Sequence, residues 1–442
     1  MIVLTPQQMQ ELDRRTIDAG TPALVLMERA ARGLVEFLIS RFRLSQERLV
    51  AVCGKGNNGA DARLAAQLLA GQGIAVAEWP TTIVPSLILD GVLGVGLRGP
   101  AQGLALDQIR WINEHRTLHG ARVVAVDVPS GLGTGEHVTA DYTVTFGALK
   151  TVHVLPPECE ACGEIHVVDI GLLPAESSLH QIDPPRIPPR PPNSHKGDYG
   201  HVLVIGGAPG KQGAAVMAGF AALRAGAGLV TVTGTASYPE LMTAEFPPAW
   251  PRAGPPPWMG KTVIAIGPGL GGNSIELVRR LYAECPVPVV VDADGLNSLA
   301  GWELPIPPAL RVLTPHPGEF RRLAPELAID SGASRVTAAC QFALQHGVTM
   351  VLKGYRTVVA GPDGIAYVNP TGSPAMAKAG SGDILTGLIA GLLAQPHVPA
   401  PVTAAVWLHG RCGELGERDK AFTLLATELL DYLPDALRSA HA

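Results

Sequence analysis

Charged and aromatic residues are scarce in this sequence, and basic residues are not in excess. Charged side chains make up 17 % of the 442 residues, aromatic ones 5 %, and the formal charge is -5. A nucleic-acid binder or a polybasic membrane anchor would concentrate Lys and Arg, and no such concentration is present. We therefore expect a protein that acts on small molecules, with no nucleic-acid or membrane partner.

Long apolar runs and a cysteine framework are also missing. No run reaches the length that spans a bilayer, and residues 1–16 lack a basic leader followed by an apolar segment, so we expect a cytoplasmic location. The chain has 6 cysteines. The close pair Cys159 and Cys162 lacks the second pair that a zinc site would need.

The length of the chain favours two domains, and a proline-rich segment marks where they divide. Residues 177–193, SSLHQIDPPRIPPRPPN, include six prolines and show neither helical nor strand periodicity. Proline at this density predicts an extended, semi-rigid connector. We place the domains at residues 1–190 and 191–442.

Both halves alternate apolar strands with helices, which predicts α/β domains with parallel sheets and helices on both faces. The first helix is expected to open at Thr5, which forms a capping box with Gln8, with Pro6 at the first helical position. Ligand sites are expected at the carboxyl ends of the strands. The strands expected in the two halves are RLVAVCG, IAVAEW, LILDGVLG, RVVAVDVPSG, HVLVIGG, GLVTVTG, TVIAIGPG, PVVVDADG, RVLTPHPGE and TMVLKG.

The segment GKGNNG, residues 54–59, matches the glycine pattern of a dinucleotide-binding turn, and Glu78 ends the next strand. A single match of this kind is weak evidence. The neighbouring Asn57 and Asn58 are unusual there, because their side-chain amides would place polar groups in the cleft where a pyrophosphate needs only backbone.

Two further strands of the first half end in acids, Asp90 and Asp127, and Ser130 follows the second. Oxygen atoms of Asn58, Asp90 and Ser130 could meet at one sheet edge and bind a hard cation. The alternative is that both acids only cap turns, since turn-forming residues collect at strand ends.

The motifs GKGNNGAD, DGVLGVGLRGP, AVDVPSGL and TVTFGALK, in this order, resemble the N-terminal epimerase domain of the bifunctional NAD(P)H-hydrate repair enzymes. The resemblance implies a Rossmann-like domain that interconverts the two C6 epimers of hydrated NADH or NADPH and binds K⁺. It implies K⁺ ligands at Asn58, Asp90 and Ser130, a catalytic Asp127, and a hydrate site formed by Asn57, Asn58, Gly59, Ala60, Asp61, Gly94, Val95, Gly96, Leu97, Arg98, Gly99, Pro100 and Asp127.

This chain departs from that family pattern in two places. Ala60 and Ala62 stand where the family usually has glycine, and the segment 63–90 is shorter than the family norm. A non-catalytic module that binds a nucleotide or a partner is therefore an alternative for the first domain.

In the second half, Asp383 stands alone between the small-residue loop Gly380-Ser381-Gly382 and a nearly wholly apolar helix. Free backbone amides at a helix start can hold phosphate, and a carboxylate beside them can accept a proton from an attacking hydroxyl. No Walker loop competes for phosphate, because GGAPGKQG, residues 206–213, lacks Ser or Thr after its Lys.

The GSGD loop and the segment PHPGE around Glu319 resemble the ribokinase-like superfamily, in which this glutamate organises Mg²⁺-bound water. Seven ordered segments from Ser194 to Asp383 make the resemblance more specific: SHKGDYGHVLVIGG, AALRAGAGLVTV, IGPGLG, DADGLN, TPHPGEF, LKGYRT and NPTGSPAMAKAGSGD. They resemble the ADP-dependent NAD(P)H-hydrate dehydratases, which phosphorylate the C6 hydroxyl and then eliminate phosphate.

This second resemblance implies a ribokinase-like domain that uses Mg²⁺ and ADP, with Asp383 as the catalytic base. It implies hydrate contacts from Ala214, Gly269, His316 and Asp383, and nucleotide contacts from Lys353, Gly354, Tyr355, Arg356, Thr357 and Gly382. Family members tend to assemble, so a homo-oligomer is expected. A vitamin-precursor kinase with the same fold is the alternative for this domain.

Several residues of the last helices have structural interpretations. Gly387 and Gly391, four residues apart, are expected to permit close helix packing, and the apolar residues from Ile384 to Leu393 are expected to face the core. Trp407 and His409 are expected to pack a helix.

Overall fold

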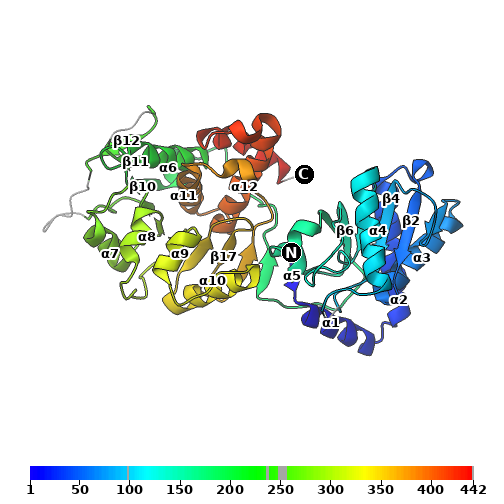
Figure 1. The fold of residues 1–442 in the computed structure, drawn as a ribbon. Helices are drawn as coiled ribbons and strands as arrows, with labels where there is room; N and C mark the ends of the chain where they lie inside the picture. The colour runs from blue at the N-terminus through cyan, green and yellow to red at the C-terminus, as the bar shows by residue number, and fades with distance from the viewer. Residues whose placement is uncertain (97–98, 235–237, 247–255, 441–442) are drawn as a thin grey trace. The chain divides into compact units, whose positions relative to one another are not determined.

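The structure is a computed structural model that describes residues 1–96, 99–234, 238–246 and 256–440 (Figure 1). The chain divides into two compact units, residues 1–179 and 180–442. Each unit has its own sheet and core. In the described residues no helix combines the length and apolar character needed to cross a membrane.

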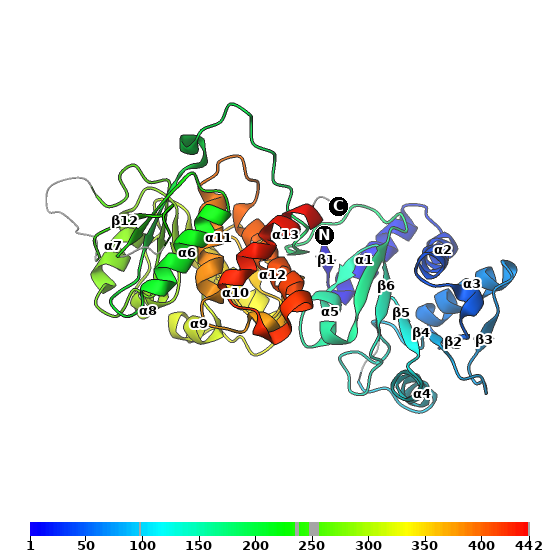
Figure 2. The same ribbon diagram turned by 90° about the horizontal axis from the view of Figure 1, so that it is seen from above.

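The first unit is built on a six-stranded parallel sheet in the order β3-β2-β4-β5-β6-β8. Apolar side chains alternate between its two faces, as expected for a sheet covered on both sides. Helices α2 and α3 pack on one face and α4 on the other (Figure 2). The strands are β2 (Leu49–Cys53), β3 (Val76–Glu78), β4 (Leu87–Gly91), β5 (Arg122–Val126), β6 (Tyr142–Phe146) and β8 (Glu164–Val168), and the helices are α2 (Ala23–Arg41), α3 (Asn57–Gly71) and α4 (Leu104–His119).

The short segment predicted between Arg63 and Asp90 retains its strand but has no crossover helix. Residues 79–86 pass from β3 to β4 without a helix or strand. Trp79, the first residue of this segment, packs against the apolar cluster between the sheet and α4. The sheet is therefore continuous although no helix connects β3 to β4.

A small N-terminal subassembly lies beside the carboxyl ends of the strands. Helix α1 (Pro6–Asp18) begins with the predicted capping box, in which Gln8 N donates to Thr5 Oγ1 and Thr5 N donates to Gln8 Oε1. Strand β1 (Val3–Leu4) pairs in parallel with β7 (Leu149–Lys150), and the four-residue helix α5 (Thr151–Val154) follows. This arrangement places α1 next to Lys150.

The second unit contains a ten-stranded sheet in the order β12-β11-β10-β13-β14-β15-β16-β17-β18-β9. Pairing is parallel from β12 to β16 and antiparallel from β16 to β18. The strands are β9 (Leu179–Gln181), β10 (His201–Ile205), β11 (Leu229–Thr233), β12 (Met242–Ala244), β13 (Val263–Ile266), β14 (Val289–Val291), β15 (Arg311–Leu313), β16 (Thr349–Leu352), β17 (Val358–Ala360) and β18 (Ala366–Val368).

Helices cover both faces of this sheet (Figure 1). One face holds α6 (Gln212–Arg224), α11 (Ser381–Leu393) and α12 (Pro401–Lys420), and α13 (Leu433–Ser439) packs against α12. The predicted role of the glycines of α11 is confirmed: a Cβ on Gly387 would lie 2.1 Å from Ala218 O, and one on Gly391 would lie 2.5 Å from Ala222 O. The remaining helices are α7 (Ile275–Glu284), α8 (Asp294–Leu299), α9 (Pro317–Leu323) and α10 (Gly332–His346).

The proline-rich connector differs from the expectation in one respect. Its first residues form β9, which lies beside β18 at the edge of the second sheet, and Ile182 N donates to Val368 O. The absence of alternation in so short a strand explains why sequence periodicity missed it. From His180 onward the connector thus belongs to the second unit.

Candidate active sites

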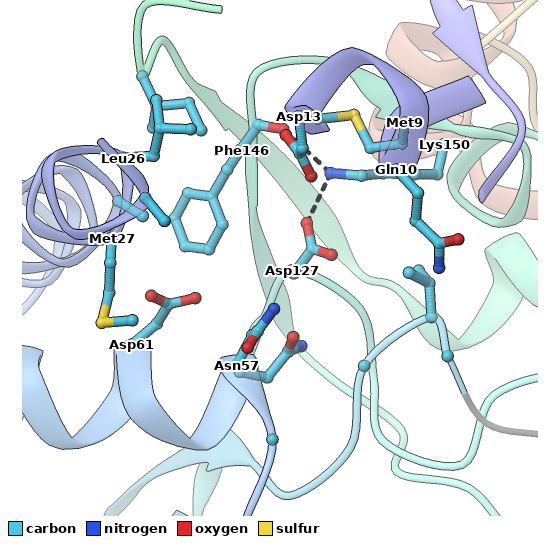
Figure 3. Close-up of a pocket in the computed structure, with 18 of the residues that line it drawn as sticks. Met9, Gln10, Asp13, Leu26, Met27, Asn57, Asp61, Asp127, Phe146 and Lys150 are labelled. Carbon is cyan, nitrogen blue, oxygen red and sulfur yellow. Dashed lines mark hydrogen bonds and ion pairs between the residues drawn. The ribbon is translucent and has the colours of Figure 1, made fainter. Parts of the chain in front are cut away.

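The first unit contains a cavity of about 680 Å³ at the carboxyl ends of its central strands (Figure 3). Helices α1 and α2 supply an apolar wall that includes Met9, Leu26 and Met27, and Phe146 contributes a ring from the end of β6. Among the described residues, four charged side chains line the cavity: Asp13, Asp61, Asp127 and Lys150. A space of this size and composition suits a small-molecule ligand with an apolar ring and a few polar groups.

Asp127 and Lys150 form a buried ion pair in this cavity. Lys150 Nζ donates to Asp127 Oδ1 at 2.6 Å and also to Thr145 Oγ1 and the Phe146 carbonyl, at 2.7 and 3.0 Å. Lys150 is 1 % exposed. Asp127 has φ 67°, an uncommon value for a residue other than glycine, which directs the chain sharply away from the end of β5.

The surroundings of Asp127 keep it ionised. Burial acts to raise the pKa of this carboxyl, but the charge and hydrogen bond of Lys150 outweigh burial and leave the pKa below its usual value. His153 Nδ1 accepts from Lys150 N, so its Nε2 is the atom that donates to Asp127 O at 2.9 Å. Burial lowers the pKa of His153 to about 4, so this imidazole is neutral.

The other two acids of the cavity have raised pKa values. Burial, together with the negative charge of Asp127, raises the pKa of Asp61 to about 7. Burial also raises the pKa of Asp13, against the opposing charge of Lys150. Perturbed carboxyl groups that line a cavity mark a candidate active site.

The structure gathers part of the predicted hydrate site at this cavity. Asn57, Asn58, Asp61 and Asp127 line it together with Gly94, Val95 and Gly96. In the described chain Gly59, Ala60, Gly99 and Pro100 are not among the lining residues, and Leu97 and Arg98 lie outside the described residues. Ala62 faces Gly91 of β4, so the alanine at this position packs against the sheet.

The three predicted cation ligands are close together and buried. Ser130 Oγ donates to Asp90 Oδ1 at 2.5 Å, and Ser130 N donates to Asp90 Oδ2 at 2.9 Å. The Asn58 amide and the Ser130 hydroxyl both approach the Leu93 carbonyl, at 3.5 and 3.2 Å. Burial raises the pKa of Asp90 to about 6, and no Lys, Arg or His pairs with it among the described residues.

In the second unit, charged side chains meet where β14, β15 and β16 end. Lys353 Nζ lies 2.6 Å from Asp292 Oδ1 and 3.9 Å from Glu319 Oε2. Thr314 and Thr386 donate to the two oxygens of Asp292, at 2.8 and 2.9 Å. Asp292 and Glu319 are nearly buried, so their charges act on their neighbours with little screening by solvent.

Asp383 stands in the first turn of α11, next to this cluster. Gly380, at φ 93°, begins the helix, and a Cβ on Gly382 would lie 3.4 Å from Lys353 Nζ. Burial, followed by the charge of Asp292, raises the pKa of Asp383 to about 7, against the opposing effect of Lys353. Asp383 can therefore exchange a proton near neutral pH beside free helix amides.

The predicted nucleotide segment from Lys353 to Thr357 is a turn held from behind by Arg335. The Arg335 guanidinium donates to the carbonyls of Tyr355, Leu352 and Lys353, at 2.8, 3.3 and 3.3 Å. The Tyr355 side chain is 56 % exposed, whereas the Lys353 amine points into the Asp292 cluster. Gly354 and Tyr355 are thus the exposed residues of this turn.

The remaining predicted hydrate contacts come from three separate elements. A Cβ on Gly269, which follows β13, would lie 3.1 Å from Ala214 Cβ on α6. His316 caps α9 through Nδ1, and its backbone N–H donates to Glu319 Oε2 at 2.8 Å. All three positions follow or face the carboxyl ends of parallel strands.

Sequence reasoning assigned no role to Lys150, Asp13 and Asp292, which the structure places in the two sites. Lys150 and Asp292 each directly follow or end a strand, and that placement was the signal available in the sequence. His409 was expected to pack a helix; it is buried, and its Nε2 also lies 3.3 Å from Ser381 Oγ in the GSGD loop.

The fold and the two sites define an α/β protein in which one unit has a charged ligand cavity and the other places a carboxylate among helix-start amides. Residues 202–435 match the family model of NAD(P)H-hydrate dehydratase, and residues 23–83 and 77–152 match that of the YjeF-related protein N-terminus. The bifunctional NAD(P)H-hydrate repair enzymes Nnr of Moorella thermoacetica and Thermofilum pendens are 35 % and 32 % identical to this chain, and each comparison covers 99 % of this chain and 97 % of the relative. The chain belongs to the family of bifunctional NAD(P)H-hydrate repair enzymes.

Solved structures support the fold of the second unit. The ADP/ATP-dependent NAD(P)H-hydrate dehydratase from Bacillus subtilis, co-crystallised with ATP and Mg²⁺, is 35 % identical, with a TM-score of 0.51 over 57 % of this chain and 94 % of that chain. A ribokinase-like superfamily protein from Enterococcus faecalis is 26 % identical, with a TM-score of 0.51 over 61 % of this chain and 98 % of that chain. The predicted fold class is confirmed.

The comparison with the Moorella relative also bears on the shortened segment. That alignment extends over 524 positions, whereas this chain has 442 residues, so the relative has segments that this chain lacks. The two matches to the N-terminal family model meet at residues 77–83, where β3 leads into the helix-free crossover.

Proposed function

We propose that the chain repairs hydrated NADH and NADPH by two reactions. The first unit interconverts the two C6 epimers of the hydrate, and the second removes water from the S epimer with consumption of ADP. The observation that carries this proposal is Asp383, a carboxylate with a pKa of about 7 next to the free amides of α11. Its setting suits base-assisted transfer of a phosphoryl group to the C6 hydroxyl.

In the second unit, Asp383 takes the proton of the C6 hydroxyl while the amides around Gly382 stabilise the transferring phosphoryl group. Hydroxide is a poor leaving group at neutral pH, but phosphate leaves readily when the ring nitrogen supplies electrons toward C6. Loss of a proton from C5 then restores the C5–C6 double bond of the reduced nicotinamide. The turn from Lys353 to Thr357 holds the nucleotide. Ala214, Gly269 and His316 contact the hydrate.

Mg²⁺ accompanies the nucleotide in this proposal. Mg²⁺ commonly binds through one or two carboxylates together with substrate phosphates, and the buried carboxylate of Glu319 at the sheet edge fits that requirement. The described residues contain no group of three or more His, Cys, Asp or Glu side chains that could hold a metal alone. The ion would neutralise charge on the transferring phosphate.

In the first unit, the hydrated nicotinamide enters the cavity between α1, α2 and the sheet. Asp127 contacts the hydrate as the ionised member of the Asp127–Lys150 pair. The start of α3 at Asn57 offers backbone amides to the diphosphate. Gly59, Ala60, Gly99 and Pro100 contact those parts of the ligand that extend outside the cavity.

The near-ultraviolet absorbance of reduced nicotinamide tests both reactions at once. The protein is mixed with an epimer mixture of NADH hydrate, Mg²⁺ and either ADP or ATP. We expect recovery of all the absorbance, because the second unit consumes one epimer and the first supplies it from the other. Recovery of one epimer's share would contradict the epimerase proposal. A stable phosphorylated product without absorbance would favour a small-molecule kinase.

We also propose that Asn58, Asp90 and Ser130 hold K⁺. The donor set consists of oxygens, which suits a hard cation, and the buried Asp90 carboxylate has no cationic side chain beside it in the described structure. A bound cation would stabilise its charge.

Replacing choline with K⁺ at matched ionic strength should raise the midpoint of thermal unfolding of the first unit, because a ligand that binds only the folded state stabilises it. The increase should disappear in Asp90→Asn. Differential scanning calorimetry measures the effect. An equal increase in the parent and in Asp90→Asn would exclude this site.

A further inference from the structure

Asp61 is a largely buried carboxylate in the cavity of the first unit. It lies on α3, is 9 % exposed and lines the cavity. Its carboxylate has no hydrogen bond or ion pair among the described residues. Its oxygens are not enclosed by protein atoms but open onto the cavity, and a carboxyl with a perturbed pKa that faces a ligand cavity is a candidate for chemistry.

Asp127, the other acid on the sheet side of the cavity, is in the opposite situation. Its Oδ1 accepts from Lys150 Nζ and from Thr145 Oγ1, at 2.6 and 2.9 Å. A carboxylate held in this way is stable as an anion and is a poor acceptor and donor of a proton. Figure 3 shows Asp61 and Asp127 reaching into the same space beside the ring of Phe146.

The charges around Asp61 allow its carboxyl group to bind and release a proton near neutral pH. In the part of the chain that the structure describes, the other charged side chains that line this cavity are Asp13 from α1, Asp127 after β5 and Lys150 from β7. Lys150 is already neutralised by Asp127, and burial next to that anion brings the pKa of Asp61 to about 7. Both protonation states of Asp61 are therefore populated at neutral pH.

The epimerisation itself needs one mobile proton. In the hydrate, C6 bears a hydroxyl group and is bonded to the ring nitrogen N1, which makes it a carbinolamine. When the O–H bond breaks, the C6–N1 bond can break with its electron pair going to N1, so that a C6 aldehyde and an N1–H bond form. Rotation about C5–C6 and the reverse steps close the ring on the other face. No oxidant or reductant is required.

We propose that Asp61 is the catalytic residue that takes the proton from the C6 hydroxyl and returns it to N1, and that it reverses both transfers on closure. The Asp127–Lys150 pair stays ionised and fixes the electrostatic environment of the reacting ring. Phe146 and Met27 form the apolar wall against which the ring turns. This inference rests on the proposed epimerase function.

The test uses the full chain without nucleotide, so that the second unit is idle. A single purified epimer of NADH hydrate is added, and chromatography follows the appearance of the other epimer above the spontaneous rate. Asp61→Ala should lower the exchange rate at least about 100-fold, the usual range for loss of a general acid–base group. Added formate should restore part of the rate. The matched control is Asp107→Asn, an exposed acid on α4, which should exchange at the parent rate.

Formate rescue separates a chemical role from a structural one, because a small acid cannot repair a misfolded helix. Exchange by Asp61→Ala at a rate close to that of the parent would overturn the inference. A second measurement does not depend on this variant: the exchange rate of the parent should bend near pH 7, and Asp61→Glu should move the bend. An unchanged bend in Asp61→Glu would also overturn it.

Failure of the underlying function is distinguishable from failure of this inference. If the parent chain shows no exchange above the spontaneous rate, the proposed epimerase activity is wrong. If the parent exchanges and the Asp61 variants behave like it, the activity stands and another group carries the proton.

Discussion

Asp383→Asn is expected to lower the dehydration rate at least about 100-fold while nucleotide binding is retained. The amide keeps the shape of the side chain but cannot accept the proton of the C6 hydroxyl. The amides of α11 and the turn held by Arg335 are unaffected, and these are the groups proposed to hold the nucleotide. Recovery of absorbance from the S epimer measures the rate, and calorimetric titration with ADP measures binding.

The pH dependence of the dehydration rate of the parent chain provides a second test of the role of Asp383. Asp383 is active as the base form, and its pKa is raised to about 7, so the dehydration rate should increase with pH through about 7 and then level off. The control is Asp363→Asn, an acid in the exposed turn between β17 and β18, which should leave the rate unchanged. Full turnover by Asp383→Asn would remove this residue from the mechanism.

Lys150→Met is expected to have the largest effect on stability. Removing the cation leaves the carboxylate of Asp127 buried without its charge partner, a change that typically destabilises a protein by about 3–5 kcal/mol. The same substitution should abolish epimer exchange, because the ion pair is part of the proposed hydrate site. The free energy of unfolding should partly recover in the double variant Lys150→Met/Asp127→Asn, in which neither charge remains.

Because the chain has two folded units, a single unfolding midpoint is not well defined. The stability of each unit must therefore be measured separately. Hydrogen exchange followed peptide by peptide gives the protection of β5 and β6 separately from that of the second sheet. Arg14→Met is the control, since Arg14 pairs with Glu11 at the surface and its side chain is 64 % exposed. Unchanged protection of β5 and β6 in Lys150→Met would show that the pair contributes no stability.

The sequence predicted those parts of the fold that have a strong local pattern. Each strand expected in the two halves is present, and the capping box at Thr5 is confirmed, because apolar runs that end in Gly or Asp indicate buried parallel strands. Strands β6 and β8, of five residues each, were not among those expected. Short strands such as β1, β7 and β9 were not found either. Two or three residues are too few for an alternating pattern to be detected.

The sites were predictable to the extent that motifs mark them. Asp127 and Asp61 line one cavity, and Asp383 stands at the start of α11, at positions that the resemblances had indicated. Their roles remain proposals. The partners Lys150 and Asp292 were not assigned, since a lysine or an aspartate at a strand end has no distinctive pattern until folding brings its counter-charge to it. The direction of a pKa shift depends on those partners and could not be read from the sequence.

Strand β9 has a practical consequence for dividing the chain. It occupies the outer edge of the second sheet beside β18, and the proline-rich residues follow it directly. A cut near residue 190 would give β9 to the wrong fragment and expose the backbone N–H and C=O groups of β18. Uncovered edge strands recruit other chains and promote aggregation. A separately produced second half should therefore begin before Leu179.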